Sequence, residues 1–292
     1  MLISDKWEDY ALLDASDGYR LERFGEIYLI RPDAQIVWKS EINHPRWNDV
    51  HAKFVRSSKG GGVWQKFKKI PDTWTISHEN LTFNLSLMGF KHVGVFMEQA
   101  AVWSKTSAQI KQIAKLKGEP AKILNLFAYT GGATLTALAE NAHVTHVDAS
   151  KGMVERAKMN AKSSKLNDKP VRWLIDDCLK FVEREIRRGN KYDGIIMDPP
   201  SYGRGPSGEL WQLEDKIFEF VSLTARLLEK RGFMVVNSYS TGISHKSIDN
   251  ILKIAAADFG DCKIESDVLG LPVKNSDLVL PCGASSRITV GF

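Results

Sequence analysis

Up to residue 94, the chain is dominated by short runs in which apolar and polar residues alternate. An alternation with period two places every second side chain on one face of a β-strand. The dipeptides Asp17-Gly18 and Phe24-Gly25 are typical of tight turns between strands. The pattern therefore predicts a β-rich N-terminal region, with strands near residues 12–13, 19–24 and 27–30 and within 73–87.

From Phe96 onward, the pattern changes to strands that alternate with helices of amphipathic spacing. A first helix is expected over residues 98–117. Five strand–helix pairs follow, with strands at 123–127, 144–147, 171–175, 192–197 and 233–237. Their helices are expected at 132–141, 152–165, 179–188, 210–230 and 247–259. Two last strands, at 263–269 and 287–292, have no helix between them.

This order of elements predicts an α/β fold. Five consecutive strand–helix pairs build a parallel sheet with helices on both faces. The last two strands, joined by a loop alone, predict an antiparallel hairpin at one edge of that sheet. We therefore expect a small β-rich domain over residues 1–94 and an α/β domain over residues 95–292.

Composition limits the class of protein. With 292 residues, 43% hydrophobic and 26% charged, the chain is typical of a globular protein. No apolar run approaches the ~20 residues that cross a bilayer, and the charged first ten residues lack the apolar core of a signal peptide. The three cysteines, Cys178, Cys262 and Cys282, are far apart and form no C-x-x-C pair. We therefore expect no disulfide framework, no metal site and a cytoplasmic location.

Positive charge is concentrated in one segment. No acidic residue lies between Asp49 and Asp72, a stretch that contains Gly60-Gly61-Gly62 and the aromatic residues Trp64 and Phe67. Its six cations are Lys53, Arg56, Lys59, Lys66, Lys68 and Lys69. A flexible basic loop with aromatic residues is suited to a polyanion such as RNA. The alternative is a solvated loop that is basic only for solubility.

A buried-strand pattern ends in Asp198-Pro199-Pro200, with Tyr202 two residues further on. Neither proline has a backbone N–H, so this loop offers the Asp198 carboxylate and backbone carbonyls as acceptors without competing donors. A neighbouring aromatic ring can stack on a planar base. The combination favours holding an amino-bearing heterocycle, and the alternative is a plain turn at the end of a strand.

The first strand of the α/β region leads into the turn Asn125-Leu-Phe-Ala-Tyr-Thr-Gly131. This turn lacks the G-x-G-x-x-G glycines of a dinucleotide site, so we expect a cofactor without a pyrophosphate. Asp148 ends the second strand and Asp177 follows the third. An acid at the first position can accept from ribose hydroxyls, and one at the second from an adenine amino group. Each acid could instead cap the following helix.

Together, Asn125–Gly131, Val147-Asp148-Ala-Ser150, Asp177-Cys178 and Met197-Asp-Pro-Pro200 resemble the motifs of class I S-adenosylmethionine-dependent methyltransferases. More narrowly, the chain resembles the large-subunit ribosomal RNA methyltransferases of the RlmI and RlmK type. The resemblance covers residues 91–292 and implies a Rossmann-like seven-stranded sheet and S-adenosyl-L-methionine as the cofactor. The candidate cofactor-binding residues are Phe96, Gln99, Asn125, Phe127, Tyr129, Thr130, Gly131, Asp148, Ala149, Ser150, Asp177, Cys178 and Asp198.

The chain also departs from that family. Members that methylate carbon 5 of cytosine use a cysteine after the fifth strand, where this chain has Asn237-Ser-Tyr-Ser240. A covalent mechanism is therefore disfavoured. The N-terminal region does not show the PUA-type RNA-binding domain of some members.

The leading hypothesis is methyl transfer to a nitrogen of an RNA base, ribosomal RNA by resemblance. Asp198, Pro199, Pro200 and Tyr202 form the candidate catalytic loop. The candidate substrate-binding residues are Lys53, Arg56, Lys66, Lys68, Lys69, Arg204 and Tyr239. Residues 203–208 could form a lid or a plain surface connection. The alternatives are a protein or small-molecule methyltransferase on the same fold, or a catalytically silent RNA-binding factor.

Overall fold

The computed structural model describes residues 1–57, 61–204 and 210–292, and the chain divides into two compact units. One unit comprises Met1, Val102–Val268 and Gly283–Phe292, and we call it the methyltransferase-like unit. The other, the N-terminal unit, comprises Leu2–Ala101 and Leu269–Cys282. The sequence led us to expect two consecutive domains, 1–94 and 95–292. In the structure each unit combines segments from different parts of the chain.

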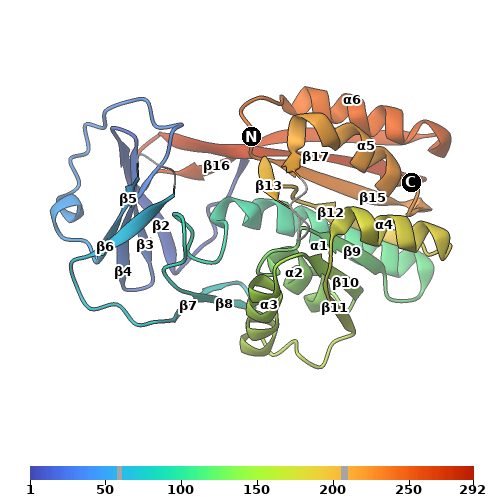
Figure 1. The fold of residues 1–292 in the computed structure, drawn as a ribbon, viewed down its shortest axis with the longest axis horizontal. Helices are drawn as coiled ribbons and strands as arrows, with labels where there is room; N and C mark the ends of the chain where they lie inside the picture. The colour runs from blue at the N-terminus through green and yellow to red at the C-terminus, as the bar shows by residue number, and fades with distance from the viewer. Residues whose placement is uncertain (58–60, 205–209) are drawn as a thin grey trace. The chain divides into compact units, whose positions relative to one another are not determined.

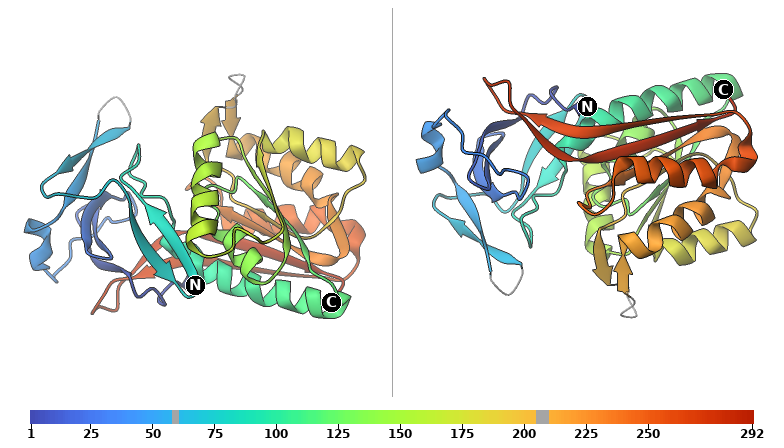
Figure 2. Two further views of the ribbon diagram at one scale, coloured as in Figure 1. Left: turned by 90° about the horizontal axis from the view of Figure 1, so that it is seen from below. Right: turned by 90° about the horizontal axis from the view of Figure 1, so that it is seen from above.

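The methyltransferase-like unit is a parallel sheet extended by two long strands (Figure 1). The sheet has eight strands, in the order β1-β16-β17-β15-β12-β9-β10-β11, because the two-residue strand β1 (Leu2–Ile3) adds an edge to the seven expected. The pairs among β15, β12, β9, β10 and β11 are parallel, and β17 is antiparallel to β15. The strands are β9 (Lys122–Leu126), β10 (His143–Asp148), β11 (Val171–Ile175), β12 (Tyr192–Met197), β15 (Leu228–Ser238), β16 (Cys262–Pro272) and β17 (Val279–Val290). This arrangement confirms the α/β prediction, and β16 and β17 are neighbours as expected (Figure 2).

Helices cover both faces of the sheet, with α1, α2 and α3 on one side and α4, α5 and α6 on the other (Figure 1). Their bounds are α1 (Ala100–Lys117), α2 (Gly132–Ala139), α3 (Lys151–Ser163), α4 (Cys178–Arg187), α5 (Leu213–Ala225) and α6 (His245–Ala255), the last followed by the 3₁₀ turn η3 (Ala257–Phe259). A core of buried aliphatic and aromatic side chains lies between the sheet and α4, α5 and α6. No helix among the described residues is long and apolar enough to cross a membrane.

The expected helix over residues 210–230 is wrong at both ends. Leu210–Gln212 forms a short strand, β14, paired with β13 (Tyr202–Arg204). The helix ends at Ala225, and Leu228 already pairs with Tyr192 in the sheet. Leu227 and Leu228 are buried in the core. Their spacing matches the apolar positions of the helix, which is why the sequence predicted a helix that extends past Ala225. The last strand also begins earlier than expected, at Val279 instead of residue 287.

The N-terminal unit is built from strands, as predicted. A five-stranded sheet has the order β2-β3-β4-β5-β6, and β7 pairs with β8 in a separate hairpin. The bounds are β2 (Tyr10–Ser16), β3 (Tyr19–Phe24), β4 (Ile27–Pro32), β5 (Ala52–Arg56), β6 (Gly62–Lys66), β7 (Trp74–His78) and β8 (Leu81–Leu85), with 3₁₀ turns η1 (Pro45–Asn48) and η2 (Met97–Gln99). A buried carboxylate, Glu22, accepts two hydrogen bonds from Arg31 and one from Tyr10, which fixes β2, β3 and β4 together.

Residues from the far end of the chain complete this unit. The strand β1 (Leu2–Ile3) pairs in parallel with Leu269 and Gly270 of β16. Further along, Lys274 donates its backbone N–H to the carbonyl of Leu12 at 2.8 Å. Local sequence patterns carry no information on such pairings, because the paired residues lie at opposite ends of the chain.

Candidate active site

The turn from Phe127 to Gly131, which we call the cofactor turn, joins β9 to α2 through left-handed backbone conformations. The φ angles are 53° at Phe127, 50° at Tyr129 and 88° at Gly131. Such angles are uncommon for residues other than glycine and cluster at functional sites. At Gly131 a side chain is excluded as well, because a Cβ atom there would lie 3.0 Å from the Cβ of Ala157. The backbone of the turn is therefore tightly wound between the sheet and α3.

Asp148, at the end of β10, holds this turn. One carboxylate oxygen accepts the backbone N–H of Tyr129 and the other accepts that of Ser150, both at 2.8 Å. The alternative of an N-cap is not realised by Asp148, since Ser150 occupies the N-cap position of α3. Burial raises the pKa of Asp148, and the two N–H donors oppose that rise. Each oxygen retains a second acceptor position, which fits the hydroxyls of a ribose. Ala149 lies between the two residues of this arrangement.

Asp177 does cap a helix. It is the N-cap residue of α4, and one of its oxygens accepts the backbone N–H of Lys180 at 2.9 Å. A carboxylate has two oxygens, so capping leaves the second for a donor such as an amino group. The neighbouring Asp176 forms an ion pair with Arg184. Asp177 is thus the better candidate of the two acids for a ligand contact.

Cys178 supports the cofactor turn from within the core. Its sulfur accepts the backbone N–H of Phe127 at 3.3 Å, and the residue is 4% exposed. Burial raises the pKa of the Cys178 thiol far above its usual range. A buried thiol that stays protonated is a poor nucleophile. The structure therefore gives Cys178 a packing role beneath the turn.

Asn125 also lies beneath the turn. It is 4% exposed, and its side-chain amide donates to the hydroxyl of Thr134, which in turn contacts Nδ1 of His146. Both of these distances are 2.9 Å. Asn160 of α3 donates to the backbone carbonyl of Thr130 at 2.9 Å. Asn125 thus supports the turn through the core, and sequence reasoning missed its partners because buried polar residues leave no periodic signal.

The second part of the candidate site is the Asp-Pro-Pro loop that follows β12. Asp198 is half-buried, Pro199 is buried and Pro200 is exposed. The carbonyl of Pro200 accepts the indole N–H of Trp211 at 2.6 Å. Of the two proline carbonyls expected to face a substrate, that of Pro200 is therefore already engaged by the protein.

The segment after this loop is a hairpin of β13 and β14, in which Tyr202 pairs with Gln212. Tyr202 is 61% exposed, so its ring is accessible for stacking. Residues 205–208 of the expected lid, and the side chain of Arg204, lie outside the described part of the chain.

Trp211 connects the two parts of the site. Its ring centroid lies 5.4 Å from that of Phe127 in the cofactor turn and 5.7 Å from that of Phe220, at 90° to the latter. The rings of Phe127 and Phe220 are 5.4 Å apart. Sequence reasoning missed Trp211. One signal in the sequence could have found it. The indole N–H of Trp211 is a donor close in sequence to a loop whose prolines offer only acceptors, which predicts a bond between them.

Tyr239 follows β15 and is half-buried. Gly283 lies against its ring, because a Cβ atom there would be 2.8 Å from Cδ1 of Tyr239. The next residue, Ser240, donates to Glu214 of α5 at 2.5 Å.

The other predicted residues belong to the N-terminal unit. Phe96 is the N-cap residue of η2 and its ring centroid is 5.3 Å from that of His92. Gln99 is 6% exposed. These two residues stay predictions as cofactor contacts.

The basic segment is not a flexible loop over its described residues. Lys53 and Arg56 lie on β5, and Lys66 lies on the antiparallel strand β6. Lys68 pairs with Asp49, and Lys69 is exposed. Trp64 is anchored on the sheet, since its indole N–H donates to the carbonyl of Met88 at 2.8 Å and its ring packs on that of Phe54. The run Gly60-Gly61-Gly62 is typical of a loop, so the sequence did not indicate the pairing of β5 with β6. Lys59 and Gly60 lie outside the described residues.

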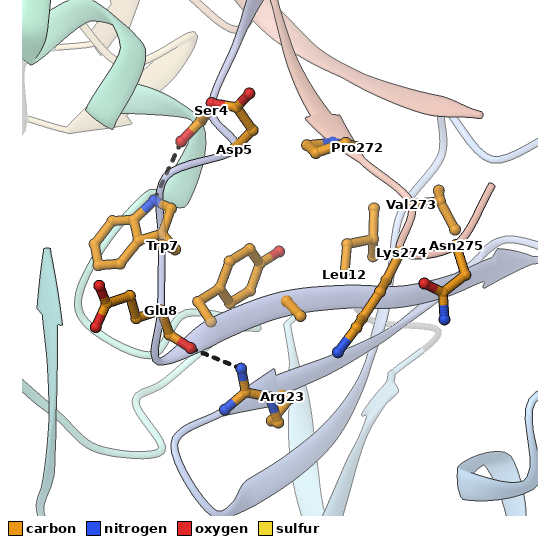
Figure 3. Close-up of a pocket in the computed structure, with 12 residues that line it drawn as sticks. Ser4, Asp5, Trp7, Glu8, Leu12, Arg23, Pro272, Val273, Lys274 and Asn275 are labelled. Atoms are coloured by element: carbon orange, nitrogen blue, oxygen red, sulfur yellow. Dashed lines mark hydrogen bonds between the residues drawn. The ribbon is translucent and has the colours of Figure 1, made fainter. Parts of the chain in front are cut away.

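A cavity of about 420 Å³ in the N-terminal unit contains none of the predicted residues (Figure 3). Asp5 and Glu8 lie on its rim together with Lys274. Arg23 is directed to the backbone carbonyl of Glu8, at 2.8 Å. Because the lining has charges of both signs, the cavity shows no preference for a ligand of one charge. Among the described residues, no group of three or more His, Cys, Asp or Glu side chains could hold a metal ion.

Similarity to known proteins agrees with this geometry. The family model for S-adenosylmethionine-dependent methyltransferases matches residues 58–224. A crystal structure of a SAM-dependent methyltransferase from Agrobacterium tumefaciens is 34% identical, with a TM-score of 0.90. The match covers 99% of this chain and 92% of that one.

Two ribosomal RNA methyltransferases are more distant relatives. Large subunit methyltransferase K/L of Colwellia psychrerythraea is 26% identical over 168 residues, which are 57% of this chain and 22% of that protein. Large subunit methyltransferase I of Tolumonas auensis is 27% identical over 264 residues, which are 88% of this chain and 62% of that protein. The chain thus spans less than two thirds of the length of either. The family match over more than half of the sequence is decisive, and the chain belongs to the S-adenosylmethionine-dependent methyltransferases.

Proposed function

We propose that this methyltransferase transfers the methyl group of S-adenosylmethionine to a nitrogen of an RNA base, with ribosomal RNA as the substrate. The observation that carries the proposal is the Asp-Pro-Pro loop beside the cofactor turn. The strand end that precedes Asp198 pairs with the one that precedes Phe127, and Trp211 bonds to Pro200 and packs on Phe127. The names of the two ribosomal RNA methyltransferases support RNA as the substrate class.

The cofactor turn and the strand ends around it fit S-adenosylmethionine. Asp148 would accept from the ribose hydroxyls, and Asp177 from the adenine amino group. Tyr129 and Gly131 would bring the backbone close to the ligand, since both have positive φ. Phe96 and Gln99 are proposed as further contacts. The bound cofactor supplies a methyl group on a sulfonium, which is already activated for displacement.

The protein then mainly has to align the substrate. Asp198 would accept a hydrogen bond from an amino group of the base, and the carbonyl of Pro199 is the second acceptor. Tyr202, which is 61% exposed, would stack on the base. A base within a duplex cannot reach this loop, so the target would be unpaired or flipped out.

A nitrogen nucleophile carries its own lone pair and needs no covalent activation by the enzyme. This agrees with Asn237-Ser-Tyr-Ser240 in place of a cysteine after the fifth parallel strand. It also agrees with the buried, protonated thiol of Cys178. We therefore propose a mechanism without a cysteine nucleophile.

The proposal is tested with tritiated S-adenosylmethionine and a lysate of a strain that lacks the gene. Label that nuclease removes and protease spares is the expected result. Label that protease removes would move the substrate to protein. Label in neither fraction, with the cofactor still bound in calorimetry, would indicate a small-molecule substrate or a silent binding protein. Asp198→Ala serves as the matched control, because it should bind the cofactor and transfer little label.

A further inference from the structure

One side of the five-stranded sheet in the N-terminal unit carries two tyrosines. In the β3–β4 register Tyr28 is opposite Arg23, and Tyr19 is two residues from Leu21, the partner of Ile30. Ile30 pairs in turn with Lys53 of β5. Directly paired residues share a sheet face, so Tyr19, Tyr28 and Lys53 lie on the same side. We call this side, together with Val55 and Val63, the tyrosine face; β3 to β6 can be followed in Figure 1.

The opposite side of the sheet is core. Glu22, Leu29, Ala52 and Phe54, which alternate with the residues of the tyrosine face, are at most 3% exposed. On the tyrosine face, by contrast, Val63 is 68% exposed and Val55 40% exposed. Both tyrosines are half-buried, because they pack against a small cluster around Leu21 and Ile30. Each ring is thus anchored on the sheet and still partly accessible.

Cations cover both tyrosine rings. The ammonium of Lys53 lies 4.3 Å from the ring centroid of Tyr19. The guanidinium of Arg46 lies 4.4 Å from that of Tyr28, which also stacks on His51 at 13°. Stacking of a nucleic-acid base on an aromatic ring is stronger than the attraction of an exposed cation to the same ring. A base could therefore displace each cation and leave it close enough to meet a phosphate.

The charge around the tyrosine face is positive. Of the acids near it, Asp49 already pairs with both Arg46 and Lys68, and the buried Asp14 accepts the indole N–H of Trp47. Glu26 is exposed and lies close enough to act on the pKa of His51. Burial, with Lys68 as the next cause, lowers the pKa of His51, which leaves its ring neutral at pH 7. Lys53 adds a cation that no carboxylate offsets among the ion pairs of the described residues. Surfaces that bind single-stranded nucleic acid combine aromatic rings, on which bases stack, with positive charge that attracts the phosphates.

We propose that the tyrosine face binds a single-stranded segment of RNA. Bases would stack on Tyr19 and Tyr28, and Lys53 and Arg46 would pair with the phosphates on either side. This inference rests on the proposed RNA substrate and adds to it the surface that holds the strand. It moves the stacking role from Trp64, which is packed against Phe54 at 5.4 Å, to the two tyrosines.

The experiment measures binding of a fluorescein-labelled homouridine strand of about 16 nucleotides by anisotropy, at several salt concentrations between about 50 and 200 mM. Tyr19→Leu and Tyr28→Leu should each weaken binding by about 5- to 150-fold without changing the salt dependence. Lys53→Ala should lower the slope of log K against log salt by about 0.7. Stacking and phosphate contacts are thereby measured separately.

Two variants of the methyltransferase-like unit are matched controls. Phe292→Leu removes a ring that is 49% exposed, and Lys253→Ala removes an exposed cation. Both should bind like the wild type. The leucine variants could lose binding because they misfold. Lys53→Glu is a test that does not depend on them, because it reverses one charge at a partly exposed strand position and should still weaken binding.

If the wild type binds and all face variants bind like the controls, the tyrosine face is not the site, and RNA can remain the substrate. If the wild type does not bind the strand although tritium enters RNA in the transfer assay, the inference fails in the same way. Tritium in protein alone would overturn the proposed function itself, which the binding assay does not decide.

Discussion

Replacing Asp148 by alanine removes the acceptor that is proposed for the ribose. A hydrogen bond to a charged group contributes about 1.5–3 kcal/mol. Asp148 has two oxygens and a ribose two hydroxyls, so two bonds are lost. At the lower limit, about 3 kcal/mol, the affinity for S-adenosylmethionine falls by at least ~150-fold.

The same change acts on the free protein. The backbone N–H groups of Tyr129 and Ser150 both lose their acceptor, which lies 2.8 Å away in each case. Water can reach this half-buried position, so we expect a loss of about 1–3 kcal/mol in the free energy of unfolding. Asp148→Asn should be intermediate in both measurements, because a carboxamide keeps one acceptor oxygen.

The affinity of each variant for S-adenosylmethionine is measured by isothermal titration calorimetry. The temperature is one at which circular dichroism shows every variant to be folded. Asp176→Ala is the matched control, since Asp176 directly follows the neighbouring strand β11 but pairs with Arg184. It should bind the cofactor like the wild type. A folded Asp148→Ala variant with wild-type affinity would refute the assignment of Asp148 to the ribose.

Three further predictions concern the rest of the site. Asp198→Ala should bind the cofactor normally and transfer methyl groups about 100-fold more slowly. Wild-type turnover in this variant would refute the proposed role of the loop. Trp211→Phe keeps an aromatic ring, though a smaller one, and loses the bond to Pro200. Urea unfolding should therefore show a loss of at least about 0.5–1.5 kcal/mol in the free energy of unfolding, and an unchanged midpoint would count against a role for this bond. Burial lowers the pKa of His146 to about 3, from an ordinary value of 6.5. The unfolded chain therefore binds the proton first, and stability falls as pH drops below about 6.5, by about 2 kcal/mol between pH 7 and 5. His146→Leu should abolish that part of the pH dependence, and identical pH profiles would contradict the assignment.

The sequence predicted those features that follow from local rules. Asp148 was singled out because an acid at the end of a parallel strand lies at the ligand-binding edge of the sheet, and it does end β10. Asp198-Pro199-Pro200 was singled out because two prolines end a strand, and it does follow β12. Both depend only on residues that are close together along the chain. Their contacts with cofactor and substrate stay predictions.

Contacts between distant segments could not be predicted in this way. The bond from Asn160 to Thr130 spans 30 positions, and within α3 Asn160 looks like any polar helical residue. The role of Trp211 depends on its distance from Phe127, 84 positions away by subtraction. The helix expected over 210–230 failed for a related reason: pairing of Leu228 with Tyr192 outweighed the local helical spacing.

The pairing of Leu2 with Leu269, and of Lys274 with Leu12, has a consequence for synthesis of the chain on the ribosome. Domains usually fold in the order in which they are translated. The N-terminal unit cannot be completed in that order, because residues 269–282 are made after most of the methyltransferase-like unit. The strand β1 and the contact at Leu12 must wait for their partners while the sheet that follows them emerges. A truncation that ends before residue 269 would thus damage the start of the protein, and neither unit can be released by a single cut.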